Sequence, residues 1–141
     1  MEEKLAACCV ILAGSYARGE AKEWSDIDMA VVSDALPEDF SGRFRLLAEI
    51  RPDDAPIEAL GFRRQQWEEL LETGNITALD AMEFGICLRG QQYFDMLRRR
   101  FELMKDNGLT LEGVCWHIPP EALRVARLDR ERAQRSQKQA A

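Results

Sequence analysis

The sequence predicts a single α/β domain of 141 residues. Short apolar runs, which suit buried strands, alternate along the chain with longer stretches whose apolar residues recur at helical spacing. Hydrophobic residues make up 46% of the chain, enough for one sizeable core, and no low-complexity linker or internal repeat divides it. This alternation allows a small sheet flanked by helices. We therefore expect residues 1–141 to form one domain, with 119–141 as a C-terminal helix that ends in a polar tail.

The first strand is predicted at residues 6–13, a continuous apolar run that ends at Gly14 and suits burial on both faces. Gly14 permits backbone conformations that are closed to other residues, and it lets a ligand approach closely. Ser15 offers a hydroxyl beside backbone N–H groups at the start of a short helix, which is a favourable place for phosphate. Arg18 can grip a triphosphate with its planar charged group, or pair with a neighbouring glutamate as a surface residue.

Two aspartates open the second strand, which continues through residues 29–32. Residues two apart in a strand point to one face, so Asp26 and Asp28 can converge on the same ion. Oxygen ligands favour Mg²⁺, with Mn²⁺ as the alternative, and Mg²⁺ typically binds one or two carboxylates together with substrate phosphates. A third acid is expected on a neighbouring strand. Glu58 is the only charge in the apolar stretch 56–61, where an unpaired charge would be costly, so we expect a cation or a basic partner beside it.

Helices are predicted between and after these strands from apolar residues that recur at helical spacing. The first helix should cover one face of the sheet, Asn75 can cap the third, and Asn107-Gly108 can end the fourth. A last short strand or an ordered loop is expected over residues 111–116. The apolar positions are Phe40, Phe44, Leu47 and Ile50 for the first helix; Trp67, Leu70 and Leu71 for the second; Ile76, Leu79 and Met82 for the third; and Phe94, Leu97, Phe101 and Met104 for the fourth.

The Gly-Ser turn and the aspartate pair together carry a family resemblance. Gly14-Ser15, followed after ten residues by Asp26 and Asp28, resembles the signature of the minimal nucleotidyltransferase (MNT) family in the DNA polymerase beta superfamily. Arg18-Gly19 and Ser25 also resemble the family's usual form. Each fragment alone is an ordinary turn or strand edge, so the interpretation depends on their joint spacing between apolar strands.

The resemblance, which is strongest over residues 7–33, implies a polymerase beta-like fold: a small mixed β-sheet flanked by helices. It also implies ATP as substrate and two divalent ions, Mg²⁺ or Mn²⁺. The third acid of the family is often Asp, and Glu58 is our candidate for that position. The implied nucleotide-binding residues are Gly14, Ser15, Arg18 and Ser25. The implied catalytic residues, which would also hold the metal, are Asp26, Asp28 and Glu58.

The acceptor of the nucleotide separates three hypotheses. Stand-alone members resemble antitoxins of the MntA type, which act on a helical HEPN-type toxin, so the leading interpretation is transfer of AMP to a tyrosine of such a partner. The alternative enzyme transfers a nucleotide to a small molecule, as aminoglycoside-modifying members do, although these usually carry a further helical domain. The third hypothesis is a nucleotide-binding module that neutralises a partner by docking, without catalysis.

Composition restricts the partners and the compartment. The net charge of −6 disfavours broad nucleic-acid binding, although residues 119–141 carry six Arg or Lys against three acids, a local +3 that we interpret as a solvated helix. No apolar run approaches a membrane span and the start is unlike a signal peptide, which predicts a cytoplasmic protein without membrane contact. Four cysteines without zinc-ligand spacing predict buried, reduced thiols. A homo-oligomer is compatible with the sequence.

Overall fold

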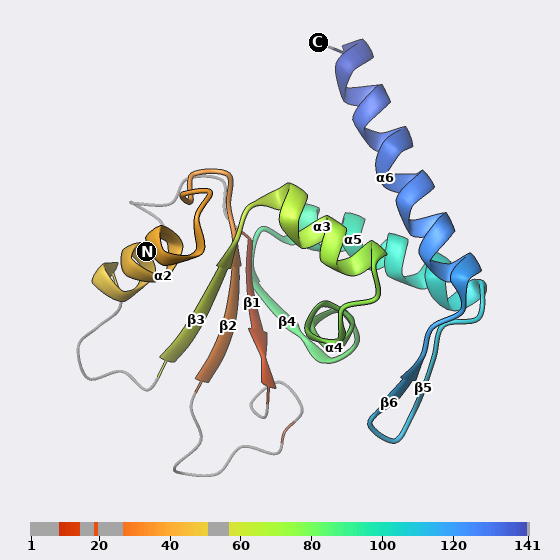
Figure 1. Cartoon of the computed structure of the whole chain (residues 1–141), viewed down its shortest axis with the longest axis horizontal. Helices are drawn as coiled ribbons and strands as arrows, with labels where there is room; N and C mark the ends of the chain where they lie inside the picture. The colour runs from red at the N-terminus through yellow and green to blue at the C-terminus, as the bar shows by residue number, and fades with distance from the viewer. Residues whose placement is uncertain (1–8, 15–18, 20–26, 51–56, 141) are drawn as a thin grey trace.

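The computed structural model describes residues 9–14, 19, 27–50 and 57–140, and a four-stranded mixed sheet lies at its centre (Figure 1). The order of the strands is β3-β2-β1-β4, in which β1 pairs antiparallel with β2 and β4 while β2 and β3 run parallel. The mixed sheet flanked by helices is therefore confirmed. The strands are β1 (Cys9–Ala13), β2 (Ile27–Val32), β3 (Ile57–Phe62) and β4 (Ile86–Arg89).

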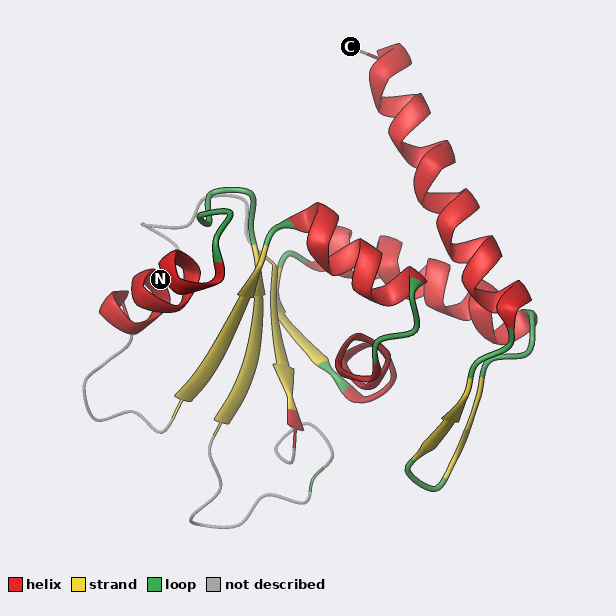
Figure 2. Cartoon of the chain, in the orientation of Figure 1, coloured by secondary structure: helices red, strands yellow, loops and turns green. Residues whose placement is uncertain are grey.

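Helices lie on both sides of this sheet, and the second half of the last helix extends away from the body (Figure 2). The four helices expected from apolar spacing are confirmed, including the cap of the third, where the side chain of Asn75 accepts hydrogen bonds from the backbone of Thr77 and Ala78. The helices are α2 (Phe40–Ile50), α3 (Arg64–Glu72), α4 (Ile76–Phe84), α5 (Gln91–Asp106) and α6 (Pro120–Ala140). None of the helices in the described parts of the chain has the length and apolarity needed to cross a membrane.

Side chains on the strands alternate between two cores. Val10 and Val31 pack with Leu36 and Leu47 in a small cluster on the side of α2. Their neighbours on β1 and β2 face the larger core, which α3, α4, α5 and α6 complete. Burial of β1 on both faces explains why its sequence is a continuous apolar run. The residues of β1 and β2 in the larger core are Cys9, Ile11, Ala30 and Val32.

One arginine joins three of these helices. Arg100 of α5 is buried, and its guanidinium lies 2.7 Å from the carboxylate of Glu68 on α3 and 2.8 Å from that of Asp129 on α6. A buried charge is tolerated only when it is paired and hydrogen-bonded, and both carboxylates here accept hydrogen bonds from the guanidinium. The first half of α6 is thereby fixed against the body of the protein.

Two elements differ from the sequence prediction. The apolar pattern does not predict β4, a short strand at the edge of the sheet in which Ile86 and Leu88 are exposed and Cys87 packs against the larger core. The segment expected to be one short strand or a loop is a hairpin of two strands, β5 (Thr110–Glu112) and β6 (Cys115–His117). Its two-residue turn begins with Gly113 at a φ of +63°, a conformation that favours glycine.

The cysteines are less uniformly buried than the sequence predicts. Cys9 on β1 is buried, but Cys87 on the edge strand is only partly covered and Cys115 on the hairpin is exposed. The prediction is wrong for Cys115 because the hairpin forms a separate two-stranded sheet that leaves this side chain in solvent. Cys8 lies outside the described residues.

Candidate functional site

A cavity of about 290 Å³ lies where β1 ends and β2 and β3 begin, with α4 as its opposite wall. Antiparallel pairing brings the end of β1 to the start of β2, and parallel pairing brings the starts of β2 and β3 together. Gly14, Asp28 and Glu58, which the sequence predicts as site residues, all line this cavity. Its volume is close to the lower end of the range for small-molecule sites, roughly 300–1,000 Å³.

Asp28 and Glu58 are direct neighbours across the parallel strands. They are partners in the register of β2 and β3, and residues in register on adjacent strands point to the same face of the sheet. Asp28 is partly buried, whereas Glu58 is exposed to the cavity. The pair therefore presents several carboxylate oxygens side by side, a donor set that suits Mg²⁺ or Mn²⁺.

Gly14 lies directly against the carboxylate of Asp28. Its φ is +67°, in the left-handed region that other residues rarely adopt. A Cβ built on Gly14 would lie 2.1 Å from Oδ2 of Asp28, closer than real Cβ atoms approach any neighbour. Glycine is thus required at this position both for the backbone conformation and for the space that the carboxylate occupies.

The remaining predicted residues, Ser15, Arg18, Ser25 and Asp26, lie outside the described part of the chain. Within the described part, no three His, Cys, Asp or Glu side chains are placed to hold a metal ion together. Asp28 and Glu58 still fit a divalent cation chemically, because Mg²⁺ commonly combines one or two carboxylates with substrate phosphates.

Asp80 is a cavity residue that the sequence analysis missed. It lies on α4, and its Oδ1 accepts a hydrogen bond of 2.9 Å from the indole Nε1 of Trp116 on the hairpin. The only other charge on α4, Glu83, forms an ion pair of 2.6 Å with Lys105 on α5. Two acids in a mostly apolar helix were a signal that could have drawn attention to Asp80.

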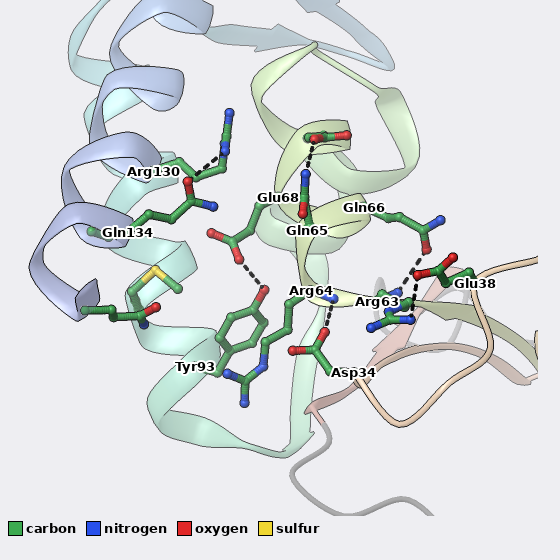
Figure 3. A pocket seen from close by; sticks show the side chains of 14 residues that line it. Asp34, Glu38, Arg63, Arg64, Gln65, Gln66, Glu68, Tyr93, Arg130 and Gln134 are labelled. Carbon is green, nitrogen blue, oxygen red and sulfur yellow. Dashed lines mark hydrogen bonds and ion pairs between the residues drawn. The ribbon is translucent and has the colours of Figure 1, made fainter. Parts of the chain in front are cut away.

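A larger cavity, of about 650 Å³, lies among α3, α5 and α6 at the other end of the sheet (Figure 3). One of its lining residues, Asp34, follows the end of β2, whereas Asp28 lies at the start of that strand. Asp28 lies four residues before the end of β2, roughly 13 Å along the strand, and Asp34 lies two residues beyond that end. The larger cavity is therefore not the site that the sequence motif predicts.

The charged and polar groups of the larger cavity bind mostly to one another (Figure 3). Arg63 lies 3.4 Å from Glu38, and the hydroxyl of Tyr93 donates a hydrogen bond of 3.1 Å to Glu68. Burial, together with the nearby charge of Glu68, raises the pKa of Tyr93 well above its ordinary value. The guanidinium of Arg64 stacks over the ring of Tyr93 at 5.1 Å. These contacts join the helices, and the predicted catalytic carboxylates lie elsewhere.

The chain is similar to a known domain family and to solved structures. A family model described as a nucleotidyltransferase domain matches residues 7–87, more than half of the chain, and this range includes Gly14, Asp28 and Glu58. A crystal structure of a toxin–antitoxin with AMP-PNP is similar at 19% identity, with a TM-score of 0.49, over 75% of this chain and 81% of that chain. A mutant of the toxin–antitoxin MntA-HpeT is similar at 17% identity, with the same TM-score and coverage. Among curated proteins no match was found.

Proposed function

Since this chain belongs to the nucleotidyltransferase domain family, we propose that it transfers a nucleoside monophosphate, AMP from ATP, to a hydroxyl acceptor. The observation that carries the proposal is the pairing of Asp28 with Glu58 beside the Gly14 turn, in a cavity of ligand size. Two adjacent carboxylates can bind cations, and a neighbouring glycine lets a phosphate group come close to the backbone. Together they suit a nucleoside triphosphate as the substrate.

Each residue has a proposed role in this reaction. The Gly14-Ser15 turn admits the β- and γ-phosphates, with Arg18 and Ser25 as further nucleotide contacts. Asp28 and Glu58 would hold the cations together with Asp26. Divalent ions at such a site neutralise phosphate charge and lower the pKa of the attacking hydroxyl.

The transfer is an in-line exchange at the α-phosphorus. The acceptor oxygen forms a bond to this phosphorus while the bond to the oxygen bridging the α- and β-phosphates breaks, and pyrophosphate leaves. Glu58 is exposed to the cavity and can accept the proton of the acceptor hydroxyl. Asp26 or Asp28 is the alternative base for this proton.

The acceptor that we propose is a tyrosine hydroxyl of a HEPN-type toxin, which makes the chain a protein adenylyltransferase of antitoxin type. The support is the resemblance of the Gly14-Ser15 and Asp26, Asp28 spacing to stand-alone members with that role. Transfer to a small molecule, and neutralisation by docking without catalysis, are the competing outcomes of the experiment below.

The test is the intact mass of a candidate partner after incubation with the chain, Mg²⁺ and ATP. We expect a gain of one AMP that disappears with Asp28→Asn or with a chelator. Asp95→Asn, an exposed residue on α5, serves as the matched control and should leave transfer unchanged. Full transfer by Asp28→Asn would overturn the assignment of the site. Binding of ATP and partner without any mass gain would favour the docking module.

A further inference from the structure

The cavity that holds Asp28 and Glu58 has a second, apolar wall. Leu60 lies two residues beyond Glu58 on the same face of β3, lines the same cavity, and is exposed. Phe62 and Trp67 continue this wall, with their ring centroids 4.9 Å apart. A mostly apolar wall with a few fixed polar groups is typical of sites that bind a flat organic ring.

Asp80 supplies a fixed hydrogen-bond acceptor in the same cavity. Its Oδ1 is held by the indole of Trp116, and this indole is itself fixed by edge-on packing against Phe101, with centroids 6.0 Å apart. The second carboxylate oxygen of Asp80 has no hydrogen-bond partner among the described residues. Because one oxygen is occupied, the carboxylate presents the other as an acceptor of defined orientation.

Trp67 offers this cavity no polar group. Its side chain is fully buried, and its indole Nε1, which has no hydrogen-bond partner within the described structure, is itself closed to solvent. A ligand in the cavity therefore cannot reach this donor. The cavity combines an apolar wall with one oriented acceptor, Asp80.

We propose that this part of the cavity binds the base of the nucleotide and selects a 6-aminopurine. Asp80 accepts a hydrogen bond from the exocyclic amino group, and the ring lies against Leu60 and Phe62. The inference rests on the proposed function, since the phosphates must lie at Gly14 for the base to reach this wall. Asp80 is a specificity-determining residue in this arrangement.

Two other roles for Asp80 fit the geometry less well. A phosphate group would be repelled by the carboxylate at short range, because like charges in a partly buried cavity interact strongly. A third metal ligand is disfavoured because Asp28, Glu58 and Asp80 do not form a cluster that could hold an ion in the described structure. A neutral N–H donor such as an amino group satisfies the free oxygen without either difficulty.

The experiment compares binding of ATP with binding of ITP, which carries a 6-oxo group in place of the 6-amino group, by calorimetry with Mg²⁺ present. We expect the wild type to prefer ATP by about tenfold to 100-fold, the worth of one hydrogen bond to a charged group. In Asp80→Asn, the amide oxygen can still accept from Trp116, while the amide nitrogen presents a donor to the cavity. The ratio of the affinity for ATP to the affinity for ITP should therefore fall to about one, or ITP should bind more tightly.

One further nucleotide and two further variants test the role of Asp80. The triphosphate of purine riboside, which lacks the 6-amino group, should bind the wild type as weakly as ITP, so a result exists even if Asp80→Asn fails to fold. Trp116→Phe should reduce the preference by freeing the carboxylate, and Asp95→Asn should leave it unchanged. Equal wild-type affinity for ATP and ITP, or an unchanged preference in a folded Asp80→Asn, would overturn the inference.

The two proposals fail in different ways. Transfer of AMP without base preference would contradict the role of Asp80 and leave the proposed function standing. A base preference in binding, without transfer to any acceptor, would support the base site and contradict catalysis. Absence of binding by either nucleotide would overturn both.

Discussion

Gly14 and Asp28 occupy adjoining space, so that a Cβ on the glycine would lie 2.1 Å from Oδ2 of the aspartate. The two residues belong to different parts of the sequence motif, and the antiparallel pairing of Ala13 with Asp28 brings them together. Gly14 and Asp28, one from each part of the motif, thus form one structural unit. This contact gives a physical reason for glycine in the motif that is independent of any ligand.

Gly14→Ala should reduce nucleotide transfer by at least about tenfold, because the methyl group must displace the carboxylate that we propose holds the cation. A tenfold loss of rate corresponds to an increase of about 1.4 kcal/mol in the activation free energy. The left-handed backbone adds strain of about 1–2 kcal/mol, measurable by urea denaturation. Gly113→Ala is the control, since Gly113 has a φ of +63° and a Cβ added there would meet nothing within 4 Å. Gly113→Ala should lose about as much stability as the strain at Gly14 costs, and it should keep its transfer activity. Equal activity in both variants would contradict the importance of this contact.

Glu58→Gln should abolish most transfer, by about 100-fold or more, with the free energy of unfolding changed by less than about 0.5 kcal/mol. The side chain is exposed in the cavity, so its removal leaves the core intact while a carboxylate oxygen is lost beside Asp28. Glu58→Asp should retain part of the activity, because the charge is kept on a shorter side chain. Steady-state rates at saturating ATP and thermal denaturation check both statements. A fully active Glu58→Gln would remove this residue from the site.

The local sequence predicts much of this fold because each main element carries its own signal. A continuous apolar run indicates β1, and helical spacing of residues such as Trp67 and Leu71 indicates the helices that cover the larger core. The strand β4 gives no comparable signal because it lies at the edge of the sheet, and its pairing with β1 depends on residues far away in sequence.

Local sequence signals also indicate the family and several residues of the candidate site. The spacing of Gly14, Asp28 and their neighbours indicates a nucleotidyltransferase, and the family is confirmed. That Asp28 and Glu58 are register partners could only be seen once β2 and β3 were paired. Asp80 was missed because its place in the cavity depends on α4 facing the sheet, and its orientation depends on Trp116, 36 residues later.

Arg100→Met should destabilise the protein by about 1–3 kcal/mol, since it removes the hydrogen bonds that the partly exposed carboxylates of Glu68 and Asp129 accept from the guanidinium. The loss should appear as a lower urea midpoint, with α6 the first element to lose protection from hydrogen exchange. Arg124→Met provides the comparison, because Arg124 pairs with Glu121 within α6 at the surface and its loss should barely move the midpoint. Similar midpoints for the two variants would contradict the role assigned to Arg100.

Stability should fall as the pH rises above about 10, through Tyr93. Burial, and next the charge of Glu68, raise the pKa of Tyr93 above its ordinary value of 10.0, so the folded state keeps a proton that the unfolded chain releases. The stability that this group contributes is fully present below the unfolded pKa, and it is lost as pH rises, by at most about 1.4 kcal/mol per pH unit. Urea denaturation at pH 8 and at pH 11 should show a smaller decline in Tyr93→Phe than in the wild type. An identical decline would contradict this assignment.

Thiol reactivity should follow the exposure of the cysteines. Cys115 is exposed on the hairpin and should react fastest with iodoacetamide, whereas Cys9 is buried in the larger core and should react only after unfolding. Cys87 should react more slowly than Cys115, because burial raises the pKa of its thiol and lowers the fraction of reactive thiolate. Peptide mass spectrometry at pH 8 measures each rate, and labelling in urea should bring the three rates together. Labelling of Cys9 in the folded protein as fast as Cys115 would contradict the packing of β1 against the helices.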